Sequence, residues 1–139
     1  MDEADRDIRN RTYALFVDLG RAPTAAEVGT GANEAWRRLH DEHALVLDER
    51  GELLMANPFS AIPTPYRVHA DGRDWYGNCA WDAIGICAAL HADGRIDTTC
   101  PDCGEQIALA IENERPDDEG LFFHGLVPAA HWWDDIVFT

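Results

Sequence analysis

The sequence predicts an α+β fold, with an N-terminal winged-helix-like helical unit at residues 1–57 and a small mixed or antiparallel sheet with a buried helix at residues 58–139. Three observations predict this class. Apolar residues recur at helical spacing before His40, short apolar runs between turn residues follow, and a longer apolar run from Ala80 to Leu90 suits a buried helix.

The N-terminal unit should contain three helices. Between Asp5 and Leu19 the apolar residues fall on one helical face, and Gly20 follows as a stop signal. Thr24 and Glu27 stand three apart, as in a capping box, so a short second helix should begin there. A third helix is expected to begin near residue 33.

Short strands should follow these helices. The apolar runs at residues 45–47 and 53–55 flank a polar stretch and predict a hairpin. Three helices followed by a hairpin is the order of a winged helix. Residues 57–65 contain three prolines and are interpreted as a linker between the two units. Beyond it, strands are expected at residues 66–69, 74–76, 95–99, 106–111 and 121–127, with an acidic loop at 112–119.

Composition limits the classes of function. The chain has 139 residues, enough for one compact domain, and 46% of them are hydrophobic. Its net charge of −15 repels nucleic acid and anionic lipid, so neither is an expected partner. The charged first residues do not resemble a secretory signal, and no long apolar run occurs, so we expect a cytoplasmic protein. There, its four cysteines should be thiols, metal ligands or nucleophiles.

Cys79 and Asp82 form the most interesting pair. Cys79 precedes the apolar helix, where free backbone N–H groups favour a thiolate. Asp82 lies three residues later, on the same side of the helix. A thiolate that captures a soft metal and an acid that delivers a proton would then share one pocket. Alternatively, Cys79 is a small buried residue and Asp82 only interacts with the helix N-terminus, and spacing alone favours this simpler interpretation.

Two other segments contain candidate residues. Cys100 and Cys103, in the sequence Cys-Pro-Asp-Cys-Gly, look like half of a zinc knuckle. Because no second such motif occurs, the plainer interpretation is a turn between strands with two free thiols. The tryptophans of residues 132–135 could wall a pocket, but we expect them to pack in the core, with the neighbouring acids facing solvent.

The order of these parts resembles the alkylmercury (organomercurial) lyase family. The resemblance spans most of the chain, and its most specific stretch is Tyr-Gly-Asn-Cys-Ala-Trp-Asp at residues 76–82. It implies cleavage of a carbon–mercury bond by protonolysis, giving a hydrocarbon and Hg(II), without an organic cofactor. Cys79 would bind mercury as a thiolate, and Asp82 would help to move the proton and hold the metal. Cys100 falls where the family often carries a further, structural cysteine.

The resemblance also implies a second catalytic cysteine in a strand near the C-terminus. The chain ends at strand-like residues 136–138, about where that cysteine is expected. Three explanations stay open: a truncated chain, a divergent relative in which Cys87, Cys100 or Cys103 substitutes, or lost activity. The expected partners are a small organometallic or thiophilic substrate and, for released Hg(II), a mercuric reductase or cellular thiols.

Two rival functions come from other classes. A non-catalytic metal-binding or sensing relative would hold an ion through Cys79, Cys100 and Cys103. A winged-helix regulator would bind DNA, which the charge balance makes the weakest of the three hypotheses.

Overall fold

The computed structural model describes residues 1–118 and 120–138, and it begins with three helices. They are α1 (Glu3–Leu19), α2 (Ala25–Val28) and α3 (Ala32–Asp41). Asp2 caps α1, which ends at left-handed Gly20, and the capping box predicted at the start of α2 is confirmed. The start of α3 differs slightly from the prediction, because Gly31 rather than Asn33 occupies its N-cap.

One antiparallel sheet follows, with the strand order β1-β2-β3-β5-β4-β6-β7-β8. Its central strands β5, β4, β6 and β7 pair in continuous register, and their buried residues include Val68, Trp75 and Ile96. The strands are β1 (Val46–Leu47), β2 (Leu53–Ala56), β3 (Phe59–Ser60), β4 (Arg67–Ala70), β5 (Arg73–Gly77), β6 (Gly94–Thr99), β7 (Gln106–Glu112) and β8 (Arg115–Pro116). The predicted α+β class with an antiparallel sheet is therefore confirmed.

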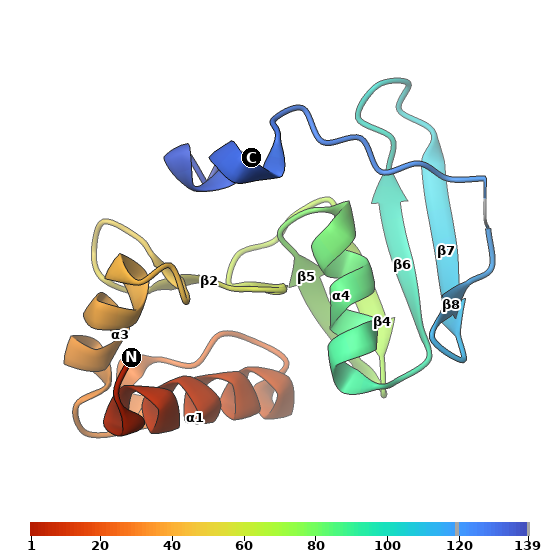
Figure 1. The fold of residues 1–139 in the computed structure, drawn as a ribbon. Helices are drawn as coiled ribbons and strands as arrows, with labels where there is room; N and C mark the ends of the chain where they lie inside the picture. The colour runs from red at the N-terminus through yellow and green to blue at the C-terminus, as the bar shows by residue number, and fades with distance from the viewer. Residues whose placement is uncertain (119, 139) are drawn as a thin grey trace.

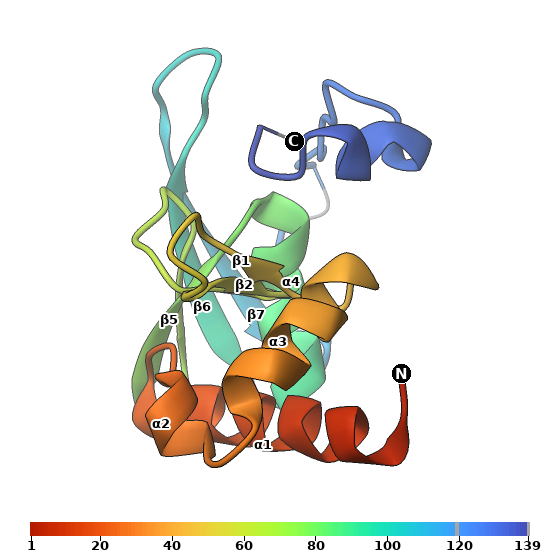
Figure 2. The same cartoon turned by 90° about the vertical axis from the view of Figure 1, so that its left-hand side faces the viewer.

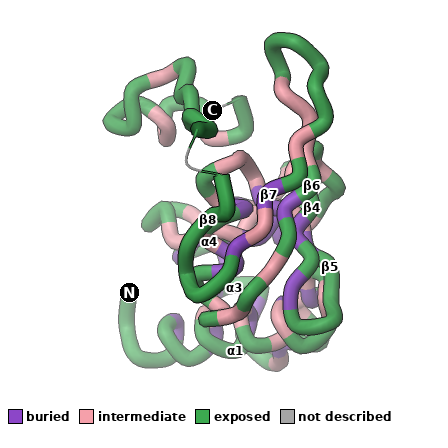
Figure 3. Tube along the Cα trace, turned by 90° about the vertical axis from the view of Figure 1, so that its right-hand side faces the viewer, coloured by how far each residue is buried: buried purple, intermediate pink, exposed green. Residues whose placement is uncertain are grey.

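The remaining long helix, α4 (Ala80–Leu90), covers one face of the sheet, as predicted. It packs against β3, β4, β5 and β6, while α1 and α3 form a separate layer beside β1 (Figures 1 and 2). Burial is concentrated where α4 and the helical layer meet the sheet, whereas the C-terminal segment is mostly exposed (Figure 3). The N-terminal end of α4 faces the C-terminal segment (Figures 1 and 2), and the ring of Trp81 in α4 lies 6.2 Å from that of Phe123.

One buried tryptophan joins α1 to the sheet, and a second joins α3 to α1. The buried indole N–H of Trp75 in β5 donates to the backbone carbonyl of Phe16 in α1, at 3.2 Å. The ring of Phe16 also stacks on that of Phe59, with ring centroids 5.1 Å apart. In the helical layer, Trp36 donates to the hydroxyl of Thr12 at 2.9 Å. The helices and the sheet thus share one hydrophobic core.

The predicted linker at residues 57–65 contains a strand. Phe59 and Ser60 form β3, which pairs with β2 on one side and with β5 on the other. Proline cannot donate to a ladder, but β3 needs only the two residues that follow Pro58. The sheet therefore runs across the boundary expected between residues 57 and 58. Both the division into two units and the winged-helix similarity of the first stay predictions.

The strand predicted at residues 121–127 is wrong. This segment has no regular secondary structure, and the side chain of Phe122 in it is 93% exposed. The sheet ends instead at the two-residue strand β8, inside the predicted acidic loop, whose residue 119 lies outside the described residues. Because Pro116 has no N–H to donate, this edge cannot extend through it. The apolar run 121–127 therefore crosses the surface.

Residues 129–138 also differ from expectation. Ala129–Asp134 form a 3-10 helix with no buried residue, and residues 136–138 form a turn rather than a strand. Neither Trp132 nor Trp133 enters the core, which corrects the preferred interpretation. Trp133 instead stacks on His43 after α3, with ring centroids 4.3 Å apart, and lines a shallow hollow with His40 and Ile136. This contact brings the C-terminal segment to the end of α3.

Gly77 allows α4 to begin directly against β5. A Cβ added at Gly77 would lie 2.6 Å from the backbone nitrogen of Ala83 and 2.9 Å from its Cα. Since both are backbone atoms of α4, the helix itself would have to shift. Gly85, one turn further along α4, is different, because its Cβ would lie 3.4 Å from the side chain of Pro58.

We predict that Gly77→Ala lowers the free energy of unfolding by about 1–3 kcal/mol, the usual cost of overpacking a core. Gly85→Ala serves as the matched control, and it should be neutral or stabilising because alanine is favoured over glycine inside a helix by up to about 1 kcal/mol. Urea unfolding of both variants measures the difference. Equal stabilities of the two variants would show that the contact between β5 and α4 leaves room for a side chain at residue 77.

Candidate functional site

Cys79 occupies the N-cap of α4, between the last strand residue Gly77 and the first helical turn. Its backbone is extended there, and its carbonyl accepts a hydrogen bond from Ala83 at 3.0 Å, which starts the helix. The side chain is half-buried. Thr64 fixes the approach of the chain, because its hydroxyl donates to the carbonyl of Gly77 at 2.6 Å. The backbone around Cys79 is therefore fixed by β5, by α4 and by the loop that contains Thr64.

Burial dominates the ionisation of Cys79. It raises the pKa of the thiol, and the negative charge of Asp82 raises it further. The backbone N–H groups of Asp82 and Trp81 lower this pKa, but they do not outweigh burial. The expected helix N-terminal effect thus exists, yet the prediction of a thiolate-favouring site is wrong. The thiol keeps its proton until something stronger than the helix terminus displaces it.

Asp82 lies in the first turn of α4 and is half-buried as well. Burial raises the pKa of its carboxyl group, while the side chain and backbone of Asn78 lower it to a lesser extent. The amide nitrogen of Asn78 donates to Oδ2 of Asp82 at 3.0 Å. Because its pKa is raised, this carboxyl holds a proton more readily than an exposed aspartate.

Asn78 connects the site to the loop before β3. Its amide nitrogen also lies 3.0 Å from Oδ1 of Asn57 and 3.4 Å from the carbonyl of Pro58. Its own Oδ1 is buried and has no hydrogen-bond partner among the described residues. A buried acceptor of this kind can receive a proton donor from a bound molecule.

Helix α1 supplies a further side chain. The hydroxyl of Tyr13 donates to the carbonyl of Asn57 at 3.0 Å, and the guanidinium of Arg9 lies over the tyrosine ring, 4.7 Å from its centroid. Burial raises the pKa of Tyr13, and the charge of Asp82 contributes to the rise. The predicted first unit therefore contributes to the surroundings of Asp82.

An apolar cavity of about 170 Å³ lies between the start of α4 and the strands β6 and β7, and neither Cys79 nor Asp82 is among its lining residues. Ala80 and Trp81, the two residues after the cysteine, line it. The cavity is closed on the other side by the segment after β8, where the ring of Phe123 lies 6.2 Å from that of Trp81. Its other lining residues are Tyr66, Ile84, Ile96, Thr98, Ile107, Leu109, Pro116, Asp118, Leu121 and Phe122.

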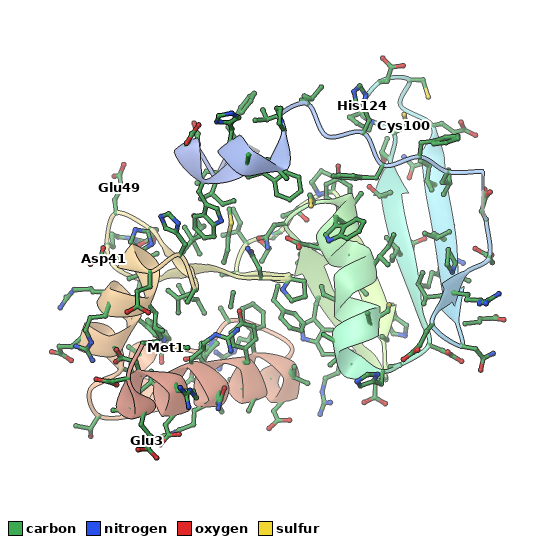
Figure 4. All side chains as sticks on the ribbon, viewed as in Figure 1. Met1, Glu3, Asp41, Glu49, Cys100 and His124 are labelled. Atoms are coloured by element: carbon green, nitrogen blue, oxygen red, sulfur yellow. The ribbon has the colours of Figure 1, made fainter. Side chains whose placement is uncertain are left out.

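Cys100 and Cys103 lie in the loop that joins β6 to β7, at the same end of the sheet as the start of α4 (Figures 1 and 4). Backbone N–H groups of Cys103 and Asp102 lower the pKa of Cys100, and the side chain of Cys103 adds to this effect. Tyr66 lies near both Cys79 and Cys100. Burial is the main cause of its raised pKa, and the charges of the two cysteines raise this pKa further.

A zinc site, the less favoured interpretation of Cys100 and Cys103, lacks further ligands among the described residues. Within residues 1–118 and 120–138, no group of three or more His, Cys, Asp or Glu side chains could hold a metal ion. A structural zinc site needs four ligands, and Cys100 and Cys103 supply two. Cys87 cannot contribute, because it is buried in the core, 1% exposed, on the sheet-facing side of α4.

Sequence reasoning found Cys79 and Asp82, and the structure brings the two together. It missed Asn78, although this residue directly precedes the cysteine. It also missed Tyr13 and Tyr66, for which local sequence gives no signal, because only the tertiary fold places them near the start of α4.

The raised pKa of Asp82 predicts a pH-dependent stability. A carboxyl whose folded-state pKa is raised stabilises the fold fully below its unfolded pKa of about 3.9, and this stabilisation is lost as pH rises through the folded pKa. We therefore expect Asp82→Asn to gain stability relative to the parent as pH rises. Urea unfolding of both proteins at a series of pH values from about 4 to about 8 measures the trend.

Asp74 offers the matched control, because Arg67 and His69 lower the pKa of its carboxyl. The sign is reversed for Asp74→Asn: it should lose stability relative to the parent only as pH rises toward the unfolded pKa of about 3.9, and this deficit should stay constant from about pH 4 to about pH 8. If both variants follow the same trend, the environment assigned to Asp82 is wrong.

The family model described as "MerB: Alkylmercury lyase" matches residues 59–139. An alkylmercury lyase from Staphylococcus epidermidis (strain ATCC 12228 / FDA PCI 1200) is 30% identical over 91 residues, covering 66% of this chain and 42% of the relative. One from Bacillus cereus is 28% identical over 88 residues, covering 63% and 40%. The chain thus spans about two fifths of the length of these relatives.

A solved structure, the mercury-bound form of MerB2, has a similar fold. Its TM-score is 0.65 at 22% sequence identity, and the match covers 85% of this chain and 60% of that one. In the part of this chain that the structure describes, no helix is long and apolar enough to cross a membrane. Since the family model matches more than half of the sequence, the chain belongs to the alkylmercury lyase family.

Proposed function

We propose that the protein cleaves the carbon–mercury bond of an organomercurial by protonolysis, with Cys79 and Asp82 as its catalytic residues. The observation that carries this proposal is that Cys79 at the N-cap and Asp82 in the first turn of α4 are both half-buried and flank Ala80 and Trp81, which line an apolar cavity. Membership of the alkylmercury lyase family supports the same reaction.

The reaction begins with the exchange of a ligand on mercury. The sulfur of Cys79 bonds to the mercury of R–Hg–X, its thiol proton leaves, and X⁻ departs. Burial raises the pKa of the free thiol, so a soft metal that bonds strongly to sulfur is the kind of electrophile that displaces this proton.

The second step needs a proton at the carbon atom. Asp82 has a raised pKa and hydrogen bonds to Asn78, which orients its carboxyl group. The electron pair of the carbon–mercury bond takes the proton, the hydrocarbon R–H leaves, and Hg(II) stays bound to sulfur. The oxidation state of mercury does not change, so no redox cofactor enters the balance.

The cavity suits the organic group of the substrate. It is lined mainly by apolar side chains, and its volume of about 170 Å³ is close to the roughly 150 Å³ of an apolar cavity that binds benzene. Tyr66 and Trp81 both line this cavity, and the charge of Cys79 acts on Tyr66. A short alkyl or a phenyl group attached to mercury would therefore sit against α4.

The product would be Hg(II) held by thiolate. In the cytoplasm, where thiols stay reduced, a mercuric reductase or a cellular thiol would then remove it by ligand exchange. We infer this location and this transfer from the chemistry of the product.

We predict that the reduced protein in excess thiol releases hydrocarbon from a simple organomercurial and that Cys79→Ser abolishes the release. Asp82→Asn, which cannot deliver a proton, should slow the release by about 10²–10⁴-fold, the range typical of general acids. Mercurial capture should survive in Asp82→Asn. Headspace gas chromatography and protein-bound mercury measure the two steps separately.

Retained turnover in Cys79→Ser would contradict the proposal. Stoichiometric binding without release in the parent protein would instead favour a non-catalytic metal-binding relative. Tyr76→Phe is a suitable control, because no part of the proposed mechanism uses this hydroxyl.

Ile84 should set the size of the organic group. Its side chain lines the cavity from α4 and is 39% exposed, so a larger residue can be tolerated. We expect Ile84→Trp to lower kcat/KM for a phenylmercurial, relative to a methylmercurial, by about tenfold or more. Ala89→Trp, at an exposed position of the same helix outside the cavity, should leave this ratio unchanged.

A further inference from the structure

The β6–β7 loop holds two thiols that the proposed reaction does not use. Cys100 is half-buried and Cys103 is exposed, and neither forms a disulfide. The loop is closed at its base by a hydrogen bond from the N–H of Cys100 to the carbonyl of Glu105 at 2.8 Å. The pair is therefore accessible and attached to a stable hairpin.

The backbone of this loop places Cys100 and Cys103 on one tight turn. The N–H of Gly104 donates to the carbonyl of Cys100 at 2.9 Å, and Gly104 has a φ of +76°. The backbone N–H groups of Asp102 and Cys103 and the side chain of Cys103 all interact with the Cys100 sulfur. Proline at position 101 restricts the chain further. The two thiols are thus three residues apart on one turn that backbone hydrogen bonds close, a spacing that lets both sulfurs reach one metal ion.

The number of ligands selects the kind of ion. In the described part of the chain, these sulfurs have no third His, Cys, Asp or Glu in a metal-binding arrangement. Zinc needs a tetrahedral set, whereas Hg(II) is soft and is satisfied by two thiolates in a line. Asp102 and the overall charge of −15 favour any cation over an anion.

We propose that Cys100 and Cys103 together bind Hg(II), as a site separate from Cys79. Two S–H bonds break, two S–Hg bonds form, and two protons pass to solvent, so the step balances without an oxidant or a reductant. The site requires no carbon–mercury cleavage, and it therefore stands or falls independently of the proposed catalytic activity.

The position of the pair relative to Cys79 follows from the sheet register. Arg67 in β4 pairs with both Tyr76 in β5 and Asp97 in β6. The chain therefore leaves β5 toward Cys79 and β6 toward Cys100 at one end of the sheet (Figure 1). Tyr66 precedes β4 at this end and interacts with both cysteines.

The test uses Hg(II) itself, added to reduced Cys79→Ser protein in the presence of a competing monothiol. We expect this variant to bind one equivalent, detected by sulfur-to-mercury charge-transfer absorption in the ultraviolet. Replacing Cys103 by Ser in this background should weaken binding by about a hundredfold or more, because the second bond is then no longer intramolecular. Buried Cys87 is unchanged in every variant and serves as the internal control.

Unchanged binding in Cys79→Ser/Cys100→Ser/Cys103→Ser would overturn the proposal. A second measurement does not depend on how the variants fold: one equivalent of Hg(II) added to the Cys79→Ser protein should protect Cys100 and Cys103 together from alkylation, as mapped by mass spectrometry. Protection of only one of them, or of neither, would also overturn it.

Discussion

The close contact between Gly77 and the backbone of Ala83 is the constraint on which the site depends. Because residue 77 lacks a side chain, only two residues, 78 and 79, separate the end of β5 from the start of α4, and the helix lies directly on the sheet. Cys79 is therefore both the last extended residue and the helix N-cap. A longer connection would leave the thiol in a solvated loop, without the burial that controls its ionisation. Packing of one strand on one helix thus determines the chemistry of the sulfur.

Burial also determines which protonation states the site favours. The helix N-terminus would favour a thiolate at Cys79 and a carboxylate at Asp82, yet the pKa of both groups is raised, with burial the largest cause. For a nucleophile that attacks carbon, a protonated thiol would be a disadvantage. For capture of a soft metal it costs little, because the S–Hg bond displaces the proton, and protonolysis requires an available proton. This environment therefore fits the protonolysis proposed above better than ordinary thiolate catalysis.

The features that the sequence predicted correctly depend on interactions between residues that are close in the chain. The capping box of Thr24 and Glu27, the Asp48–Glu52 turn and the apolar helix α4 depend on neighbouring residues and were all predictable. The strand expected at residues 121–127 failed because an apolar run does not reveal whether a sheet edge is available to it. Similarly, Trp132 and Trp133 looked like core residues, but the core was already filled by Trp36 and Trp75. Long-range partners such as Tyr13 leave no local trace at all.

Tyr13 joins the N-terminal helices to the surroundings of Asp82. A winged-helix-like unit could be a dispensable attachment to a catalytic sheet. Here α1 contacts the loop before β3 through Tyr13, and that loop contacts Asp82 through Asn57 and Asn78. Trp75 adds a buried hydrogen bond from the sheet to the same helix. The charge of Asp82 also raises the pKa of Tyr13, so α1 lies close to this carboxyl group, whose own pKa is raised mainly by burial. A chain reduced to the sheet and α4 would keep Cys79 but would lose the Tyr13 contact, so the helical layer belongs to the surroundings of the proposed catalytic residues.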